Sequence, residues 1–339
     1  MTKQMESTSR HGAPPSRYAT FMSRRASLMP TFAAVIILAV LLIGAQIRYP
    51  RFLSPGNISA LLLDNAYLVV LAVGLTFVIL TGGIDLSVGS VMAFTGILGA
   101  SMLAQGVPAV IAMPIMLVAG ALIGLLIGVL VHYFDVQPFI ASLAGLFLAR
   151  GLAFVVSLSS IRVEDPVVLW LQRTRFSVAG WYITPTGIIA LLAVGIAFYV
   201  LGWTRFGRTV YAIGGGEQSA RLMGLNVART KVAVYVISGV CGGLAGLLLT
   251  AYSGAGYPRN GIGTELDAIA AVVIGGTLLT GGTGYVLGSL IGVFVYGTIK
   301  KVISFMGAEQ SWTQIIIGAL LLVFIVVQRV IVARSQRRR

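Results

Sequence analysis

Few side chains in this chain could do acid–base or metal chemistry. Ten Asp and Glu, two His and one Cys are spread over 339 residues. The histidines, His11 and His132, lie far apart, and neither a zinc-binding HExxH motif nor a G-x-S-x-G nucleophile motif is present. We therefore expect no catalytic residue and no metal site. Cys241 lies alone in an apolar run, which predicts a small buried side chain.

One carboxylate stands out because it interrupts two long apolar runs. Asp85 lies in LTGGIDLSVGS, residues 80–90. It could serve chemistry, or it could be structural at a turn. We expect Gly82 and Gly83 to end one helix in the left-handed conformation. Asp85 would then be the N-cap of the next helix at the membrane interface. Its carboxylate would accept a hydrogen bond from the exposed amide of Ser87 or Val88.

The same pattern of LTGG, five residues and GS recurs without the acid. It reads LTGGTGYVLGS at residues 279–289 and contains Gly281 and Gly282. Glycine-interrupted apolar segments in two halves of a chain point to a transport site. We therefore predict that both turns are helix breaks or part of a translocation pathway, and that both face the same side of the membrane.

Two further charges lie within apolar runs. Asp64, in ISALLLDNAYLVV, is the best candidate for an acid buried within a span. A hydrogen bond from Asp64 to a neighbouring helix is favoured over a role in ion coupling. Arg150, in LAGLFLARGLAFVV, is the one cation in the middle of an expected span. Leaving it unpaired would cost several kcal/mol, so it should meet an acid or carbonyl groups, in a structural pair or along a pathway.

The elements that position these residues are membrane helices. The chain is 57% hydrophobic and 10% charged, with a mean hydropathy of +0.95, and its 42 glycines favour closely packed helices. We predict an all-α polytopic membrane protein in a lipid bilayer, with about ten transmembrane helices and broken or re-entrant segments. The expected spans are 31–47, 58–80, 86–104, 108–134, 138–157, 184–202, 232–252, 265–281, 284–304 and 312–329, of which 265–281 is short enough to be broken.

The basic residues predict the topology. Fifteen Lys and Arg lie in the two tails and the 203–231 loop, against eight on the other side, which favours cytoplasmic N- and C-termini. The net charge is +14, but the basic residues flank the spans and form no single patch, so we expect no nucleic-acid partner. The predicted domains are a disordered cytoplasmic tail (1–30), the transmembrane domain (31–329) with a periplasmic loop (158–183), and a basic cytoplasmic tail (330–339).

The 203–231 loop is the longest connection on the predicted cytoplasmic side. EQSARLMGL, residues 217–225, predicts a short helix with Glu217 at its N-terminus and Gly224 as its C-cap. Ala220, Leu222 and Met223 would give this helix an apolar face. So short a helix is unstable alone in water, so it should pack on its own membrane domain or on a cytoplasmic motor.

No energy source is visible within the chain. The glycine-rich YAIGGGEQSA lacks the Lys-Ser/Thr pair of a phosphate-binding loop, so we expect no cofactor bound by this chain. Most acids lie in tails, loops or span ends, where they suit ion coupling poorly. Energy should come from a partner or from an ion gradient. A gradient-driven symporter or channel is the alternative to a partner-driven transporter.

Three blocks in order resemble a known family. LTGGIDLSVGSVMAFTG, WTRFGRTVYAIGGGEQSARLMGL and ELDAIAAVVIGGTLLTGGTGYVLGS are similar to the membrane subunit of bacterial ATP-binding-cassette sugar importers of the ribose, xylose and galactose type. In detail the chain most resembles the second permease of the galactofuranose importer. The resemblance implies a permease in the bacterial inner membrane that translocates a monosaccharide, with galactofuranose or a related pentose or hexose expected.

The resemblance also implies partners. A second permease subunit, identical or different, would complete a dimer. A cytoplasmic ATPase subunit would bind ATP and Mg²⁺, and a periplasmic sugar-binding protein would deliver the substrate. The motif match assigns ATPase coupling to a set of residues in the 203–231 loop: Gly215, Glu217, Ser219, Ala220, Arg221 and Gly224.

Overall fold

The computed structural model describes residues 17–307, 309 and 311–336. The helices of this part are α1 (Arg17–Arg48), α2 (Pro55–Leu80), α3 (Val88–Ala104), α4 (Ala109–Tyr133), α5 (Pro138–Val156), α6 (Pro166–Arg173), α7 (Pro185–Trp203), α8 (Arg205–Gly215), α9 (Glu217–Leu222), α10 (Val227–Ser253), α11 (Thr264–Ile274), α12 (Val286–Phe305) and α13 (Ser311–Gln336). Two short antiparallel pairs were not predicted: β1 (Ile161–Arg162) with β4 (Ala255–Gly256), and β2 (Phe176–Val178) with β3 (Trp181–Ile183).

Each expected span contains a helix, but not every helix can cross a bilayer. Seven described helices are long and apolar enough to cross a membrane, and two shorter apolar helices, Val88–Ala104 and Ser311–Val323, add to them. The helix α11 has 11 residues, or about 16 Å at 1.5 Å per residue, half of the roughly 30 Å of hydrocarbon. Seven to nine of the ten expected spans are therefore supported among the described residues, and α11 ends at Ile274, inside the expected span 265–281.

Three expected boundaries differ from the structure. The helix α1 begins at Arg17, so residues 17–30 are helical where a disordered tail was predicted, and residues 1–16 lie outside the described part. Good helix formers such as Arg, Ala and Met account for this extension. At the other end α13 runs to Gln336, into the predicted tail at 330–339. The loop 158–183 holds β1, α6, β2 and β3.

Helix α2 runs through the centre of the bundle. In its most apolar window 78% of the residues are buried, and it packs against α7, α10, α11 and α12. The helix α10 packs in turn against α3 and α4. Gly120 and Gly239 let α4 and α10 approach backbone to backbone, because a Cβ on either would meet the carbonyl oxygen of the other. This confirms the prediction that glycines allow close helix packing.

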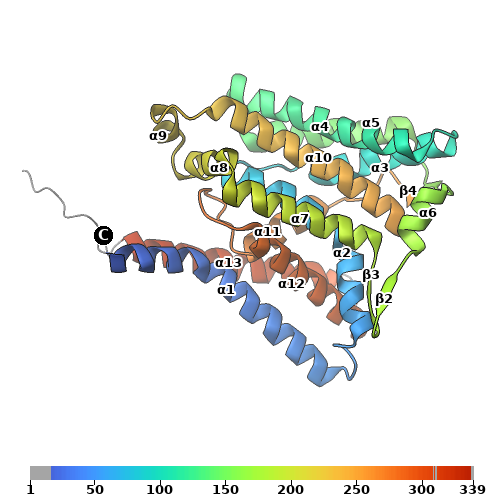
Figure 1. Cartoon of the computed structure of the whole chain (residues 1–339), viewed down its shortest axis with the longest axis horizontal. Coiled ribbons are helices and arrows are strands. Elements are labelled where there is room, and N and C mark those ends of the chain that lie inside the picture. Colours follow the sequence, from blue (N-terminus) through green and yellow to red (C-terminus); the bar gives the residue numbers. More distant parts are fainter. Residues whose placement is uncertain (1–16, 308, 310, 337–339) are drawn as a thin grey trace, which may run out of the picture.

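The two ends of the folded molecule, along the helix axes, carry different elements. Figure 1 shows α8 and α9 at the end where α1 begins and α13 finishes, and α6, β2 and β3 at the opposite end. We call these the α9 end and the α6 end.

Candidate functional site

The predicted helix in the 203–231 loop is present as α9. It spans Glu217–Leu222, and its chain leaves through Gly224, whose φ of +74° is the left-handed conformation expected of a C-cap glycine. Ala220 is fully buried with Ile213 of α8 and Val227 of α10. These contacts hold a helix that would not form alone. The helix α8 before it was not predicted, although Thr204 gives a sequence signal, because its hydroxyl caps the amide of Gly207.

One ion pair joins α9 to α10, and a second lies within α9. The Glu217 carboxylate accepts a hydrogen bond from Arg221 at 2.7 Å and one from Lys231 of α10 at 2.9 Å. Partial burial acts to raise the pKa of Glu217, but the hydrogen bonds and charges of Lys231 and Arg221 outweigh it and hold that pKa below its ordinary value. Gly215, at the end of α8, and Ser219, within α9, are exposed.

The expected apolar face of α9 is only partly correct. Ala220 packs inward, but Leu222 is 84% exposed and Met223 is 65% exposed. Leu222 is two positions from Ala220 and therefore faces away from it, whereas Met223 lies just after the last residue of α9. The α9 end therefore carries an unpartnered apolar tip on an anchored helix.

The two LTGG turns lie against each other. The amide of Gly282 donates to the carbonyl of Leu80 at 2.9 Å. Gly281 has a φ of +83°, and a Cβ placed on it would lie 2.7 Å from the backbone nitrogen of Gly82. Gly82 is left-handed as predicted, with a φ of +80°, whereas Gly83 is not; it lies instead beneath the Tyr235 hydroxyl.

The end of α8 completes this junction. A Cβ on Gly214 would overlap the backbone of both Leu80 and Gly282. Three chain segments thus meet with no side chain between them: the two turns and the helix that leads directly into α9. We call this contact of Gly82, Gly214, Gly281 and Gly282 the glycine junction.

Asp85 has a different position from the one predicted. It is 1% exposed, and the N-cap residue of α3 is Ser87. One carboxylate oxygen accepts from the Ser87 amide at 2.9 Å and hydroxyl at 2.6 Å, and the other accepts from the Ser238 hydroxyl of α10 at 2.7 Å. The expected bond to the Ser87 amide is confirmed. Glycines at 82 and 83 draw the turn inward, so the carboxylate reaches α10.

The second turn is attached through its backbone. Gly284 occupies the position that Asp85 has in the first turn, and its carbonyl oxygen accepts a hydrogen bond from the Tyr211 hydroxyl of α8 at 2.8 Å. The second LTGG turn, which lacks the acid, is therefore joined to α8, the helix that precedes α9.

Arg150 donates to carbonyl groups, one of its two expected kinds of partner. Its guanidinium donates to the carbonyl oxygens of Pro258 at 2.6 Å and Asn260 at 2.8 Å. Glu265 is near enough to interact with it electrostatically. The arginine on α5 thereby holds the segment between β4 and α11 in place.

Asp64 makes the favoured contact to a neighbouring helix. It is half-buried, and it accepts a hydrogen bond from the Tyr252 hydroxyl of α10 at 3.3 Å. Neither Asp64 nor Arg150 contacts the glycine junction through a hydrogen bond or ion pair.

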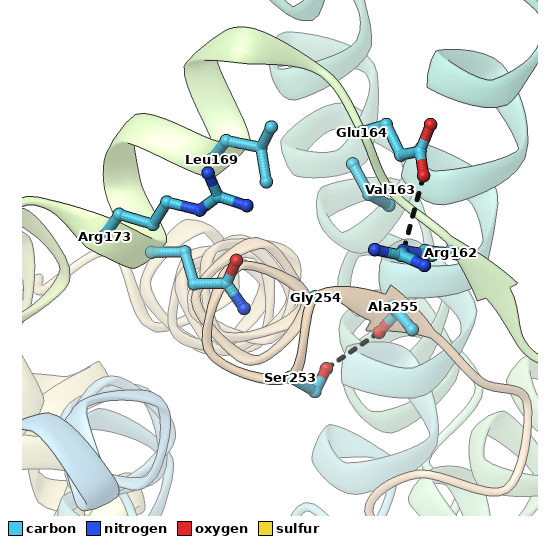
Figure 2. A pocket seen from close by; sticks show the side chains of 9 residues that line it. Arg162, Val163, Glu164, Leu169, Arg173, Ser253, Gly254 and Ala255 are labelled. Carbon is cyan, nitrogen blue, oxygen red and sulfur yellow. Dashed lines mark hydrogen bonds and ion pairs between the residues drawn. The ribbon is translucent and has the colours of Figure 1, made fainter.

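The α6 end contains a polar cavity that sequence reasoning did not find. It measures about 670 Å³ and is lined by Arg162, Glu164, Gln172, Arg173 and Ser253, among others. Figure 2 shows Arg173 and Leu169 on one side and the Arg162–Glu164 pair on the other. Both members of that pair are largely exposed, so it adds little stability. The residues come from β1, α6 and the end of α10, a combination that local patterns cannot reveal.

Comparisons with known proteins place the chain in a family. Residues 57–325 match the family described as branched-chain amino acid transport system / permease component. The chain is 44% identical over 314 residues to the fructose import permease protein FruG of Bifidobacterium longum, covering 90% of this chain and 92% of that one. It is 45% identical over 285 residues to the inner membrane ABC transporter permease protein YjfF of Escherichia coli, covering 83% and 86%.

A third relative extends the comparison. The ribose import permease protein RbsC of Escherichia coli is 37% identical over 302 residues, covering 87% of this chain and 92% of that protein. These matches span the glycine junction, α9 and the helices that hold them. The chain therefore belongs to this family of ABC transporter permeases, as a multi-pass inner-membrane subunit that carries no catalytic site of its own and leaves ATP to a partner ATPase.

Proposed function

We propose that the chain is the permease of a monosaccharide importer, with α9 as its docking helix for the ATPase. The observation that carries this proposal is the apolar tip of Leu222 and Met223 on a helix held in place by the Glu217–Lys231 ion pair and by the buried Ala220. An apolar tip rimmed by charge is typical of a protein-interaction surface. The proposal makes the α9 end cytoplasmic, together with both termini, as the distribution of basic residues favours.

The glycine junction supports a route for coupling. Movement of α9 would pass along α8 to Gly214, which touches both LTGG turns through backbone contacts alone. Backbone contacts without side chains leave no flexible group to absorb the displacement. The helices that follow the two turns, α3 and α12, would then shift together and change access to the pathway.

The other partners would occupy other surfaces. A second permease copy or homologue would complete the pathway, and the polar cavity at the α6 end faces the side on which a periplasmic sugar-binding protein would arrive. For the substrate we propose galactofuranose, which rests on the resemblance of the three sequence blocks, while the relatives are named for fructose and ribose.

A substitution in the apolar tip tests the docking role. Leu222→Glu should abolish co-purification of the ATPase and sugar uptake while membrane insertion persists, because a charge would enter an apolar contact. Leu158→Glu is the matched control, since Leu158 is 79% exposed and outside the 203–231 loop. Arg221→Glu and deletion of 217–223 should act like Leu222→Glu. Normal substrate-stimulated ATP hydrolysis in these variants would overturn the proposal.

Competition for uptake tests the substrate. Cells that express the chain with its neighbouring subunits would be given labelled galactofuranose, with ribose, fructose, arabinose and leucine as competitors. We expect unlabelled galactofuranose to compete best. Saturable ribose or fructose uptake without competition from galactofuranose would reject that sugar but keep the class, and leucine uptake alone would reject the class.

A further inference from the structure

A cavity beside the second LTGG turn is not used by the coupling proposal. It measures about 490 Å³, within the size range of small-ligand pockets. Its walls come from the end of α7, from α8, and from the turn that precedes α12. The lining residues are Phe198, Leu201, Gly202, Trp203, Arg208, Tyr211 and Gly282 to Val286.

Aromatic side chains mark this cavity as one at a membrane–water interface. Trp203 stacks on Tyr199 with the ring centroids 6.1 Å apart, and it meets Phe198 edge-on at 5.1 Å. All three rings are exposed, Trp203 by 60%. Trp and Tyr gather where lipid headgroups meet the hydrocarbon. The cavity mouth thus lies at the level of the headgroups.

The charge of the lining selects one class of ligand. Arg208 is the single charged residue among the lining residues, and its exposed guanidinium makes no ion pair with any residue in the described ranges. A guanidinium binds phosphate oxygens through two parallel hydrogen bonds. Arg205 is also exposed on α8, but it does not line the cavity. The cavity combines one free cation with mostly apolar walls.

The surface beyond the cavity suits acyl chains. Leu192 and Ile196 lie about three and two turns before Trp203 on α7 and are 59% and 64% exposed. A ligand with its phosphate at Arg208 would therefore continue along an apolar helix face. A free inorganic phosphate would use the guanidinium but leave the apolar walls unfilled.

We propose that this cavity binds the headgroup of an anionic phospholipid, with its phosphate on Arg208 and its acyl chains along α7. The lipid would contact the second LTGG turn directly, since Gly282 to Val286 form one wall. A phospholipid of the anionic leaflet would therefore contact the same turn that the Tyr211 hydroxyl joins to α8. This inference is independent of the transported substrate.

Native mass spectrometry of the full chain tests the site. The protein would be purified from membranes, exchanged into detergent with equal phosphatidylglycerol and phosphatidylcholine, and its retained lipids counted. We expect at least fivefold preference for phosphatidylglycerol, loss of that preference in Arg208→Gln, and its retention in Arg205→Gln. Equal loss in both variants would show only general attraction to positive charge. Retention in Arg208→Gln, or displacement of the lipid by millimolar inorganic phosphate, would also overturn the proposal.

Fluorescence gives a second, independent readout. Phosphatidylglycerol brominated on its acyl chains should quench Trp203 more than brominated phosphatidylcholine does, because heavy atoms quench only at short range. Trp203→Phe should remove the difference. Equal quenching by the two lipids would contradict a selective site even if Arg208→Gln folded poorly.

Discussion

The turn at 80–90 and the turn at 279–289 share LTGG and GS, yet each is attached to a different helix. In the first, the Asp85 side chain reaches Ser238 of α10. In the second, the backbone of Gly284 at the same position accepts from Tyr211 of α8. The shared glycines give both turns the shape that lets them touch, and the residue at the sixth position decides the attachment.

From this difference we expect the first turn to be the fixed one and the second turn to be the one that moves during coupling. The first turn is held by a buried carboxylate that accepts from α10. The second is joined to α8, the helix before α9, by the Tyr211 hydroxyl and the Gly214 contact. We therefore expect substitutions at the shared glycines to damage the fold, those at Asp85 to damage stability, and those at Tyr211 to damage coupling.

The largest effect should come from the junction itself. Gly214→Val would force a branched side chain into the backbone of Leu80 and Gly282, at a cost of about 3 kcal/mol or more. Gly215→Ala is the matched control, because no atom lies within 4 Å of the position its Cβ would take. Thermal unfolding in detergent measures both. Equal stability of the two variants would show that the contact of the turns is not tight.

Asp85 should give the next largest effect. Asp85→Leu leaves the Ser87 amide and two hydroxyls without their acceptor, which should cost about 2 to 5 kcal/mol for unpaired buried groups. Asp85→Asn should cost less, because its amide oxygen still accepts from Ser87 and its nitrogen can donate to the Ser238 hydroxyl. Unfolding midpoints of the two variants and of Ser238→Ala measure the difference. Equal loss of transport in both Asp85 variants at normal expression would argue for a charged role.

Tyr211→Phe should have a smaller effect on stability and a distinct effect on transport. It removes one hydrogen bond between the second turn and α8, worth about 1 kcal/mol, while the Gly214 contact remains. We expect fewer sugar molecules imported per ATP hydrolysed, measured in reconstituted vesicles. Tyr199→Phe, on an exposed tyrosine of α7, is the control. An unchanged ratio would mean that the two turns do not differ in mobility.

The smallest effect should come from Glu217. Because its pKa is held below the ordinary value, the ion pairs contribute above that value and are lost as the pH falls through the lowered pKa. Glu217→Gln should therefore raise hydrogen exchange in α9 at neutral pH, and the wild type should approach the variant only in acid. Glu164→Gln, in an exposed pair, should change nothing. Faster exchange of α9 in the Glu164 variant would contradict the assignment.

Sequence patterns predicted the helices well because hydrophobic length is a local property. The apolar runs, the α9 helix and the left-handed glycines Gly82 and Gly224 all follow from neighbouring residues. The approach of the two LTGG turns could be suspected only from their repetition, and the part played by Gly214 had no signal at all. Contacts between backbone segments far apart in the chain leave no periodic pattern.

Asp85 shows which contacts neighbouring residues can predict and which they cannot. Its bond to the Ser87 amide was predicted, since both residues belong to one turn. Its burial was not, because Ser238 lies 153 residues away and nothing near Asp85 indicates a hydroxyl partner. The direction of Leu222 and Met223 was missed for a similar reason, since a helix this short has no second turn to define a face.

The central position of α2 has a consequence for how the chain is made. Asp64 is bonded to Tyr252, which is 188 residues later in the sequence. At about 5 to 20 residues per second, a ribosome needs about 10 to 40 s to reach that tyrosine. Throughout that interval the Asp64 carboxyl lacks this hydrogen bond, so the contact between α2 and α10 can form only after α10 has been synthesised.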